Sequence, residues 1–294
     1  MRSQISAPLG FSPTAAHKLA HSDGELATSR AAAKKGIPMC LSTYATTRME
    51  DVIAQGAGNP YAKQVSFLKD RRVTERIIKR AERAGFKALF VNVDLPVLGK
   101  RVNELRNKFS PTDLEIPTLL EAGESDTIVS HGTGYDPSVT WEEAIAYLRK
   151  TTSLPIYLKG VVSAEDVQLA IDYGVDGVVI SNHGGRQLDG QASTLDVLRE
   201  VGPVARGKIS VIIDGGIRRG SDIFKAISLG ATACFVGRIA VWGLAYNGQE
   251  GVERAIDILL DEFANTMALM GCRTVADITP AHVSVLENGV LSKL

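Results

Sequence analysis

The sequence lacks an excess of charge of either sign, since its 33 lysine and arginine residues are balanced by 33 aspartate and glutamate residues. Without a basic surplus, neither a nucleic acid nor an anionic membrane surface is expected as a partner. The chain also has no apolar run long enough to span a membrane, and its first six residues lack the apolar core of a signal peptide. The expected partner is therefore a small molecule or another copy of the chain.

Cysteine is scarce: the 294 residues contain three, Cys40, Cys234 and Cys272, without CxxC spacing. This pattern argues against a disulfide framework and against a zinc site, so we interpret the three as reduced packing residues and expect no metal. The GxGxxG motif is also absent after the first expected strand, which argues against a Rossmann domain.

Eight short apolar segments alternate with helical patterns. The expected strands cover residues 8–12, 38–42, 61–67, 88–94, 155–159, 177–181, 211–214 and 233–237. Continuous apolar runs are typical of strands buried on both faces of a parallel sheet, and the alternation calls for right-handed βαβ units. Eight such units predict an α/β fold, a single-domain (β/α)8 TIM barrel; an open doubly wound sheet is the alternative that this number disfavours.

Helical spacing predicts helices near residues 25–35, 49–55, 73–84, 164–173, 194–201 and 222–229, and a long amphipathic helix at 251–270. The connection of residues 109–139, between the fourth and fifth strands, is long for this fold. We expect it to cover the mouth of the barrel as a loop.

Polar residues follow the apolar runs where the expected strands end. In a (β/α)8 barrel the active site lies at these ends, so the polar residues are expected to converge on one face. Each alone has an ordinary explanation as a helix cap, a turn residue or a solvated end. Eight together favour a site, and they are Ser42, Gln64, Asp94, Lys159, Ser181, His183, Asp214 and Arg238.

The most informative run is Ser181-Asn-His-Gly-Gly-Arg-Gln-Leu-Asp189, which follows the sixth strand. His183 could serve as a base, because imidazole exchanges protons near neutral pH. Arg186 offers a planar fork for a carboxylate, and the two glycines before it would let the backbone approach a flat ligand. In isolation, the run could also be an ordinary strand-to-helix loop.

The last two units have the features of a phosphate site. Asp214-Gly-Gly-Ile-Arg218 follows the seventh strand, and Gly237-Arg238 follows the eighth. Glycines expose backbone N–H groups to phosphate oxygens, a helix N-terminus adds partial positive charge, and arginine neutralises the dianion. Phosphate commonly binds here in such barrels, although two ordinary glycine turns would give the same pattern.

With these motifs in this order, the chain resembles the FMN-dependent L-2-hydroxy acid oxidases and dehydrogenases, which include glycolate oxidase, lactate oxidase and the flavin domain of flavocytochrome b2. The resemblance runs through residues 1–294, and the Ser181–Asp189 run is its most specific part. It also rests on Pro13-Thr-Ala15, Leu41-Ser-Thr-Tyr-Ala-Thr46, Asp94 with Pro96, Leu98-Gly-Lys-Arg101 and Leu158-Lys-Gly160.

The resemblance implies a role for each site residue. His183 would be the base that takes a proton from a 2-hydroxy acid as two electrons pass to FMN, and Asp94 would orient it. Arg186 and Arg101 would bind the substrate carboxylate, and Lys159 would stabilise the reduced flavin. The residues implied to bind FMN are Thr14, Ala15, Ser42, Gln64, Asn92, Lys159, Ser181, Asp214, Gly215, Gly216, Ile217, Arg218, Gly237 and Arg238.

Four features depart from the family pattern. Ser66 stands where the family usually has a substrate-contacting tyrosine, Asn92 where it has threonine, and Tyr44 where tryptophan is common. Family members also begin with a helical segment that brings another substrate-binding tyrosine, and we expect this chain to lack that segment. A shortened or divergent enzyme, or one with an unusual substrate, would account for these departures.

The expected function is oxidation of an L-2-hydroxy acid to the 2-oxo acid, with oxygen as the acceptor and hydrogen peroxide as a product. Two alternatives stay open: a dehydrogenase that uses another acceptor, and a flavin-binding homologue with impaired turnover. Ser292-Lys293-Leu294 matches the C-terminal tripeptide read by the peroxisomal import receptor, so a peroxisomal location is expected. The resemblance also implies a homo-oligomer.

Overall fold

The computed structural model describes residues 4–56, 58–109, 114–120, 134–287 and 290–293. The strands are β1 (Leu9–Phe11), β2 (Met39–Leu41), β3 (Tyr61–Val65), β4 (Ala88–Asn92), β5 (Ile156–Val161), β6 (Gly177–Ile180), β7 (Ser210–Asp214), β8 (Ala233–Val236), β9 (Ser284–Glu287) and β10 (Val290–Lys293). The α-helices are α1 (Gly24–Lys35), α2 (Met49–Ala54), α3 (Arg71–Ala84), α4 (Val102–Arg106), α5 (Trp141–Thr151), α6 (Ala164–Asp172), α7 (Thr194–Ala205), α8 (Gly220–Ser228) and α9 (Arg238–Leu269), and the 3-10 turns are η1 (His17–Leu19), η2 (Val275–Asp277) and η3 (Pro280–His282).

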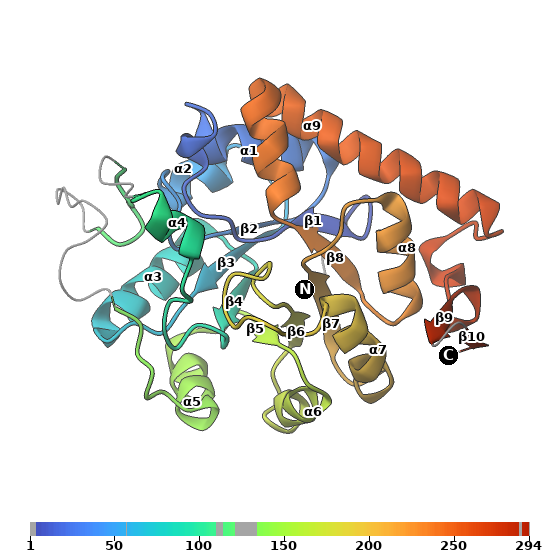
Figure 1. Ribbon diagram of the computed structural model, residues 1–294. Helices are drawn as coiled ribbons and strands as arrows, with labels where there is room; N and C mark the ends of the chain where they lie inside the picture. The colour runs from blue at the N-terminus through green and yellow to red at the C-terminus, as the bar shows by residue number, and fades with distance from the viewer. Residues whose placement is uncertain (1–3, 57, 110–113, 121–133, 288–289, 294) are drawn as a thin grey trace.

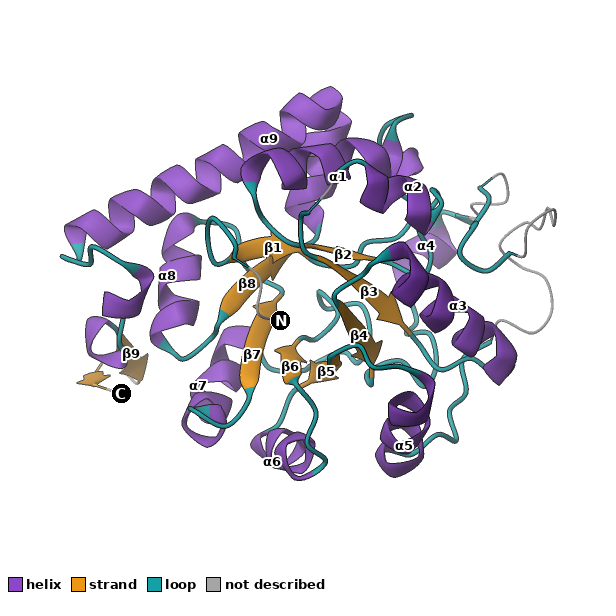
Figure 2. Ribbon diagram, turned by 180° about the vertical axis from the view of Figure 1, so that it is seen from behind, coloured by secondary structure: helices purple, strands orange, loops and turns teal. Residues whose placement is uncertain are grey.

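The first eight strands close into one parallel barrel in chain order, with helices packed around it (Figures 1 and 2). Closure occurs where Leu9 of β1 pairs with Cys234 of β8. The predicted single-domain (β/α)8 barrel is therefore confirmed, and the open sheet is wrong. Because all eight strands run in the same direction, their carboxyl ends form one ring, which is where a site is expected.

Aromatic side chains fill the inside of the barrel. The ring of Phe90 lies 5.4 Å from that of Tyr157 and 5.6 Å from that of Phe235. Two glycines make room for these rings: a Cβ at Gly177 would lie 2.1 Å from the Tyr157 ring, and one at Gly10 would lie 2.7 Å from the Phe235 ring. The interior is thus a packed core, and a ligand has to bind at the end of the barrel.

Two helices lie where the sequence pattern indicated none. The short helix α4 follows Arg101, and α5 begins with a capping box in which the side chains of Thr140 and Glu143 each accept from the other residue's backbone N–H. The Thr-x-x-Glu spacing is a readable helix signal. Of the connection expected to cover the mouth as a loop, residues 110–113 and 121–133 lie outside the described residues.

The long helix expected at residues 251–270 is confirmed as the second arm of α9, and a first arm that was not expected precedes it. Helix α9 begins at Arg238, and its helical geometry is interrupted at Asn247 and Gly248. Gly243 and Gly251 let the two arms approach each other, since a Cβ on Gly251 would lie 2.0 Å from the Gly243 carbonyl oxygen.

The three cysteines are buried and free, as predicted for packing residues. None of the helices within the described ranges is long and apolar enough to cross a membrane.

Lys63 of β3 is fully buried. Its ammonium group donates to the backbone oxygen of Ser42 at 2.6 Å and to that of Leu41 at 3.4 Å, so it holds the end of β2. Burial, which disfavours the charged form, lowers the pKa of Lys63 from 10.5 to about 7.

The lowered pKa of Lys63 predicts a pH-dependent stability. Between pH 7 and about pH 10 the unfolded chain binds the lysine proton and the folded chain does not, so the free energy of unfolding rises with pH over this window. From pH 7 to 9, the Tm of the wild type should rise relative to that of Lys63→Met by about 5 °C. Thermal unfolding at several pH values measures this difference, and a difference that does not change with pH would contradict the lowered pKa.

Candidate active site

A cavity of about 390 Å³ opens among the loops that follow β1, β5, β6, β7 and β8. This volume lies within the range of about 300–1,000 Å³ that is typical of cofactor sites. The expected site residues that line it are Thr14, Lys159, His183, Arg186, Asp214, Gly215, Gly216, Ile217, Arg218, Gly237 and Arg238.

Ser181 is the centre of a buried network beside this cavity. Its hydroxyl donates to Asp214 Oδ1 at 2.5 Å and accepts from Lys159 Nζ at 3.0 Å and from the His183 backbone N–H at 3.1 Å. The Lys159 and Asp214 side chains are 4% and 8% exposed, and their charged groups lie 3.6 Å apart, so each charge is compensated. The ends of β5, β6 and β7 are thereby fixed to one another.

Ser12, at the end of β1, was missing from the expected site. Its hydroxyl donates to Asp214 Oδ2 at 3.0 Å, which ties β1 to the same network. The signal was present, because Ser12 is a polar residue directly after an apolar run. Ala15, which was expected at the site, lies between Thr14 and Ala16, and the Ala16 N–H donates to the Tyr44 carbonyl at 3.1 Å.

His183 has a φ of +58°, and Gly184 and Gly185 continue this left-handed geometry at +69° and +74°. A non-glycine residue in this region is uncommon and is often found at functional sites. The turn brings the His183 imidazole to Asp94, with Nδ1 and Oδ2 2.9 Å apart. Two residues 89 positions apart in the sequence thus form the imidazole–carboxylate pair that the family resemblance implied.

Asp94 reaches His183 across Gly160 of β5. A Cβ on Gly160 would lie 2.4 Å from the Asp94 Cβ and 2.5 Å from its Cγ, which is closer than such contacts allow. Gly160 also has a φ of +108°, at a register shift between β5 and β6. The Asp94 carboxylate can therefore take this position only because residue 160 is a glycine and has no side chain.

Gln187, which was not expected at the site, joins the loop after β6 to the loop after β4. Its Nε2 donates to the backbone oxygens of Asp94 at 2.8 Å and of Val97 at 3.0 Å, and its Oε1 accepts from the Gly99 N–H at 2.9 Å. The loop that it holds leads to Arg101. The only sequence feature that indicated a role for Gln187 was its place within the Ser181–Asp189 run.

Arg101 and Arg186 lie close enough for their charges to interact. Desolvation first, and the positive charge of Arg101 next, lower the pKa of Arg186. The Arg101 Nε atom is buried without a hydrogen-bond partner among the residues that the structure describes. Arg101 also forms an ion pair with Glu104 at 3.7 Å, so Nε–H is the donor of Arg101 that keeps its capacity for a ligand. Two neighbouring guanidinium groups are suited to bind a carboxylate.

The ends of β2, β3 and β4 carry the other expected residues. Gln64 Oε1 accepts from the Thr43 N–H at 2.8 Å and the Ser42 hydroxyl at 3.5 Å, and Gln64 Nε2 donates to Ser66 Oγ at 3.0 Å. Asn92 Oδ1 is buried and has no partner within the described part of the chain. The amide of Asn92 thus keeps hydrogen-bonding capacity for a ligand.

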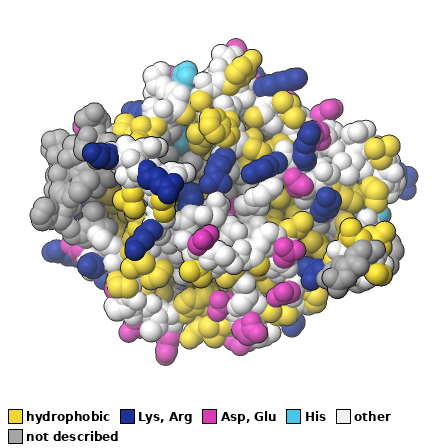
Figure 3. Space-filling model, viewed as in Figure 1, with side chains coloured by type: hydrophobic (Ala, Val, Ile, Leu, Met, Phe, Trp, Pro, Cys, Tyr) yellow, Lys and Arg dark blue, Asp and Glu magenta, His cyan; other side chains and the backbone are white. Residues whose placement is uncertain are grey.

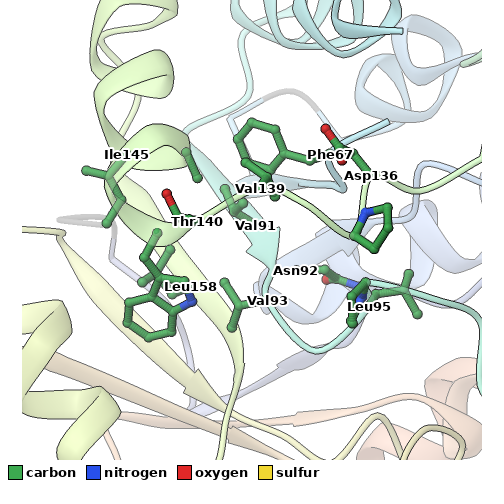
Figure 4. Close-up of a pocket in the computed structure, with 14 residues that line it drawn as sticks. Phe67, Val91, Asn92, Val93, Leu95, Asp136, Val139, Thr140, Ile145 and Leu158 are labelled. Atoms are coloured by element: carbon green, nitrogen blue, oxygen red, sulfur yellow. The ribbon is translucent and has the colours of Figure 1, made fainter. Parts of the chain in front are cut away.

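A second cavity, of about 80 Å³, lies between β4, β5 and α5 (Figure 4). Its lining is largely apolar, with Phe67, Val91, Val139 and Leu158 among the labelled side chains. Asn92 also lines it, and no other predicted site residue does.

Charge is unevenly distributed on the face seen in Figure 1. Lys and Arg side chains gather across its middle, whereas the acidic side chains lie mainly in the lower part (Figure 3). In a chain without net charge, such a separation favours an anionic ligand over the basic region.

The residues present fit a phosphorylated flavin. Arg238 is the first residue of α9, so a phosphate beside it would meet the positive end of the helix dipole, and Arg218 lines the same cavity. Gly215 and Gly216 line the cavity, and no atom lies within 4 Å of a Cβ added to Gly216, so its backbone is open to a ligand. Together with the imidazole–carboxylate pair and the two arginines, this arrangement defines a cofactor-dependent barrel enzyme with an anionic substrate.

Comparison with known proteins gives the family. The model of the family described as FMN-dependent dehydrogenase matches residues 2–285, so the chain belongs to this family and FMN is its cofactor. The resemblance to FMN-dependent 2-hydroxy acid oxidases is thereby confirmed.

Individual relatives are similar over most of the chain. Oxidase FUB9 of Fusarium oxysporum f. sp. lycopersici is 50% identical over 298 residues, which cover 98% of this chain and 76% of the relative. Glycolate oxidase 5 of Oryza sativa subsp. japonica is 44% identical over 95% of this chain and 78% of its own. A solved structure of a mandelate oxidase variant with the C4a-OH-FMN adduct has a TM-score of 0.84 and 36% identity, over 92% of this chain and 78% of that one.

The contact between Gly160 and Asp94 predicts that Gly160→Ala slows oxidation of a 2-hydroxy acid by about 100-fold, because a catalytic group displaced by about 1 Å costs that much. The FMN content should stay close to that of the wild type. The matched control is Gly174→Ala, since Gly174 also has a positive φ, +66°, but no atom within 4 Å of its added Cβ. Equal loss of activity in both variants would indicate general backbone strain instead of displacement of Asp94.

Proposed function

We propose that this protein oxidises an L-2-hydroxy acid to the 2-oxo acid with FMN as cofactor, and that oxygen accepts the electrons and becomes hydrogen peroxide. The observation that carries the proposal is the His183–Asp94 pair, with Arg186 lining the same cavity as His183 and Arg101 within electrostatic reach of Arg186. The relatives named as oxidases support oxygen as the acceptor.

His183 acts as the base in this proposal. Its Nδ1–H donates to Asp94, which leaves the lone pair of Nε2 free to take a proton from the substrate. The Asp94 carboxylate then stabilises the imidazolium that results. Because the left-handed turn and the hydrogen bond both fix the ring, little reorganisation is needed during the reaction.

Arg101 and Arg186 bind the substrate carboxylate and so orient the hydroxyl-bearing carbon toward His183. FMN, when bound, supplies the acceptor for the two electrons. Its phosphate would be held by Arg218, Gly237 and Arg238, which line the cavity. Its ring system and ribityl chain would be held by six further lining residues, Thr14, Lys159, Asp214, Gly215, Gly216 and Ile217. The other residues that would contact it are Ala15, Ser42, Gln64, Asn92 and Ser181.

We also propose that the protein enters the peroxisome through Ser292-Lys293-Leu294 and forms a homo-oligomer. Import is supported by Ser292, which lies exposed on β10, the strand paired with β9. Oligomer formation is supported by Trp242 and Tyr246 of α9, which are 71% and 83% exposed, because large exposed aromatic side chains are typical of surfaces that another copy covers. A fluorescent protein fused before residue 1 should concentrate in peroxisomes and should spread through the cytosol when residues 292–294 are removed. Light scattering of the purified protein gives the number of copies.

The proposed activity is tested first on the purified, FMN-loaded protein. Addition of glycolate, L-lactate or a longer 2-hydroxy acid without oxygen should bleach the flavin absorbance, and air should restore it with formation of peroxide. Bleaching without recovery in air would favour a dehydrogenase with another acceptor. Bound flavin that none of the acids bleaches would favour a homologue with impaired turnover.

In the same assay, His183→Gln should slow bleaching by about 10²- to 10⁴-fold, the usual effect of removing a general base. The matched control is His282→Gln, because His282 lies far along the chain in η3 and packs edge-to-face against Phe224. A wild-type rate in His183→Gln would exclude His183 as the base.

A further inference from the structure

Tyr135 is held in place by backbone pairing with the connection between β3 and α3. It forms an isolated antiparallel bridge with Leu68, and the next residue, Asp136, donates its N–H to the Phe67 carbonyl at 3.0 Å. The Asp136 carboxylate also forms an ion pair with Arg71 at 2.6 Å. These contacts with the connection between β3 and α3 fix the backbone of Tyr135, although residues 121–133 are not described.

The side chain of Tyr135 lies close to the carboxyl end of β2. Its ring packs edge-to-face against that of Tyr44, with centroids 6.4 Å apart, and Tyr44 follows β2 directly after Ser42 and Thr43. Burial raises the pKa of the Tyr135 phenol, whereas a hydrogen bond from the Tyr44 hydroxyl, which leaves the Tyr135 O–H free to donate, lowers it. The charges of Arg101 and Arg186 also lower this pKa, and that of Asp94 raises it. The phenol thus lies within electrostatic reach of the same groups that carry the proposed function.

The chemistry of these neighbours indicates what the phenol can do. Two guanidinium groups close together attract an anion, and Arg101 keeps a buried Nε–H without a partner in the described ranges. A neutral phenol that burial keeps protonated is a hydrogen-bond donor, so it adds a third donor for the same anion. Ser66, on the neighbouring strand end, is engaged with Gln64 and is 4% exposed.

We propose that Tyr135 is a substrate-binding residue whose hydroxyl donates a hydrogen bond to the substrate carboxylate held by Arg101 and Arg186. This inference rests on the proposed function, since it requires an anionic 2-hydroxy acid in the site. It adds a binding group from the segment before α5, none of whose residues belongs to the strand-end motifs.

The test uses oxalate, which has two carboxylates and no C–H bond to oxidise, so that binding is measured without turnover. Oxalate bound beside FMN should shift the visible spectrum of the loaded protein, and a titration gives its Kd. Tyr135→Phe should raise this Kd by about 10- to 100-fold, the effect expected for loss of a hydrogen bond to a charged group. With the substrate identified by bleaching, KM should rise similarly while kcat changes little.

The control is Tyr147→Phe. The Tyr147 hydroxyl donates to the Arg71 carbonyl at 3.3 Å, so this variant disturbs the same connection without removing a group from the site. A Kd for oxalate that is unchanged in Tyr135→Phe, or raised equally in both variants, would overturn the assignment of Tyr135 while leaving the proposed function intact. A wild type that binds neither oxalate nor a 2-hydroxy acid would overturn both.

Discussion

Closure of the barrel is the constraint on which the rest of the structure depends. Once β1 pairs with β8, the carboxyl ends of all strands lie on one ring, and residues far apart in the sequence meet there. Ser12 and Asp214, 202 positions apart, share a hydrogen bond for this reason alone. The aromatic side chains of Phe90, Tyr157 and Phe235 pack together inside the barrel. They fill its interior, so a ligand has to bind at the end of the barrel.

The polar network at this ring combines structural and functional roles. Ser181 contacts Lys159, Asp214 and the backbone of His183, so one hydroxyl sets the relative positions of a cation, an anion and a base. Buried charges are costly unless they are paired, and the Lys159–Asp214 pair meets that condition before any ligand binds. A site whose dipoles are already oriented has little reorganisation left for the reaction, which is how such networks favour catalysis.

The loops outside the ring depend on close backbone approach. Gly160 makes space for Asp94, Gly99 passes within reach of the Arg186 backbone, and Gln187 holds the loops after β4 and β6 together. His183 accepts an unfavourable left-handed conformation between them. Strain of this kind persists only where the surroundings fix it, and here the hydrogen bond to Asp94 and the neighbouring loop do so.

The sequence by itself determined the architecture and most of the strand-end residues, because buried parallel strands and their polar ends leave a periodic pattern that can be read locally. It also indicated His183, Asp94 and the arginines as a set, although their roles stay predictions. Only the tertiary structure decided which of these groups touch; it added Ser12 and Gln187, and it is the basis for the proposed role of Tyr135. Tyr135 left no local signal, since its place depends on pairing with Leu68 from a distant segment, and pairing of this kind is set by packing instead of by neighbouring residues.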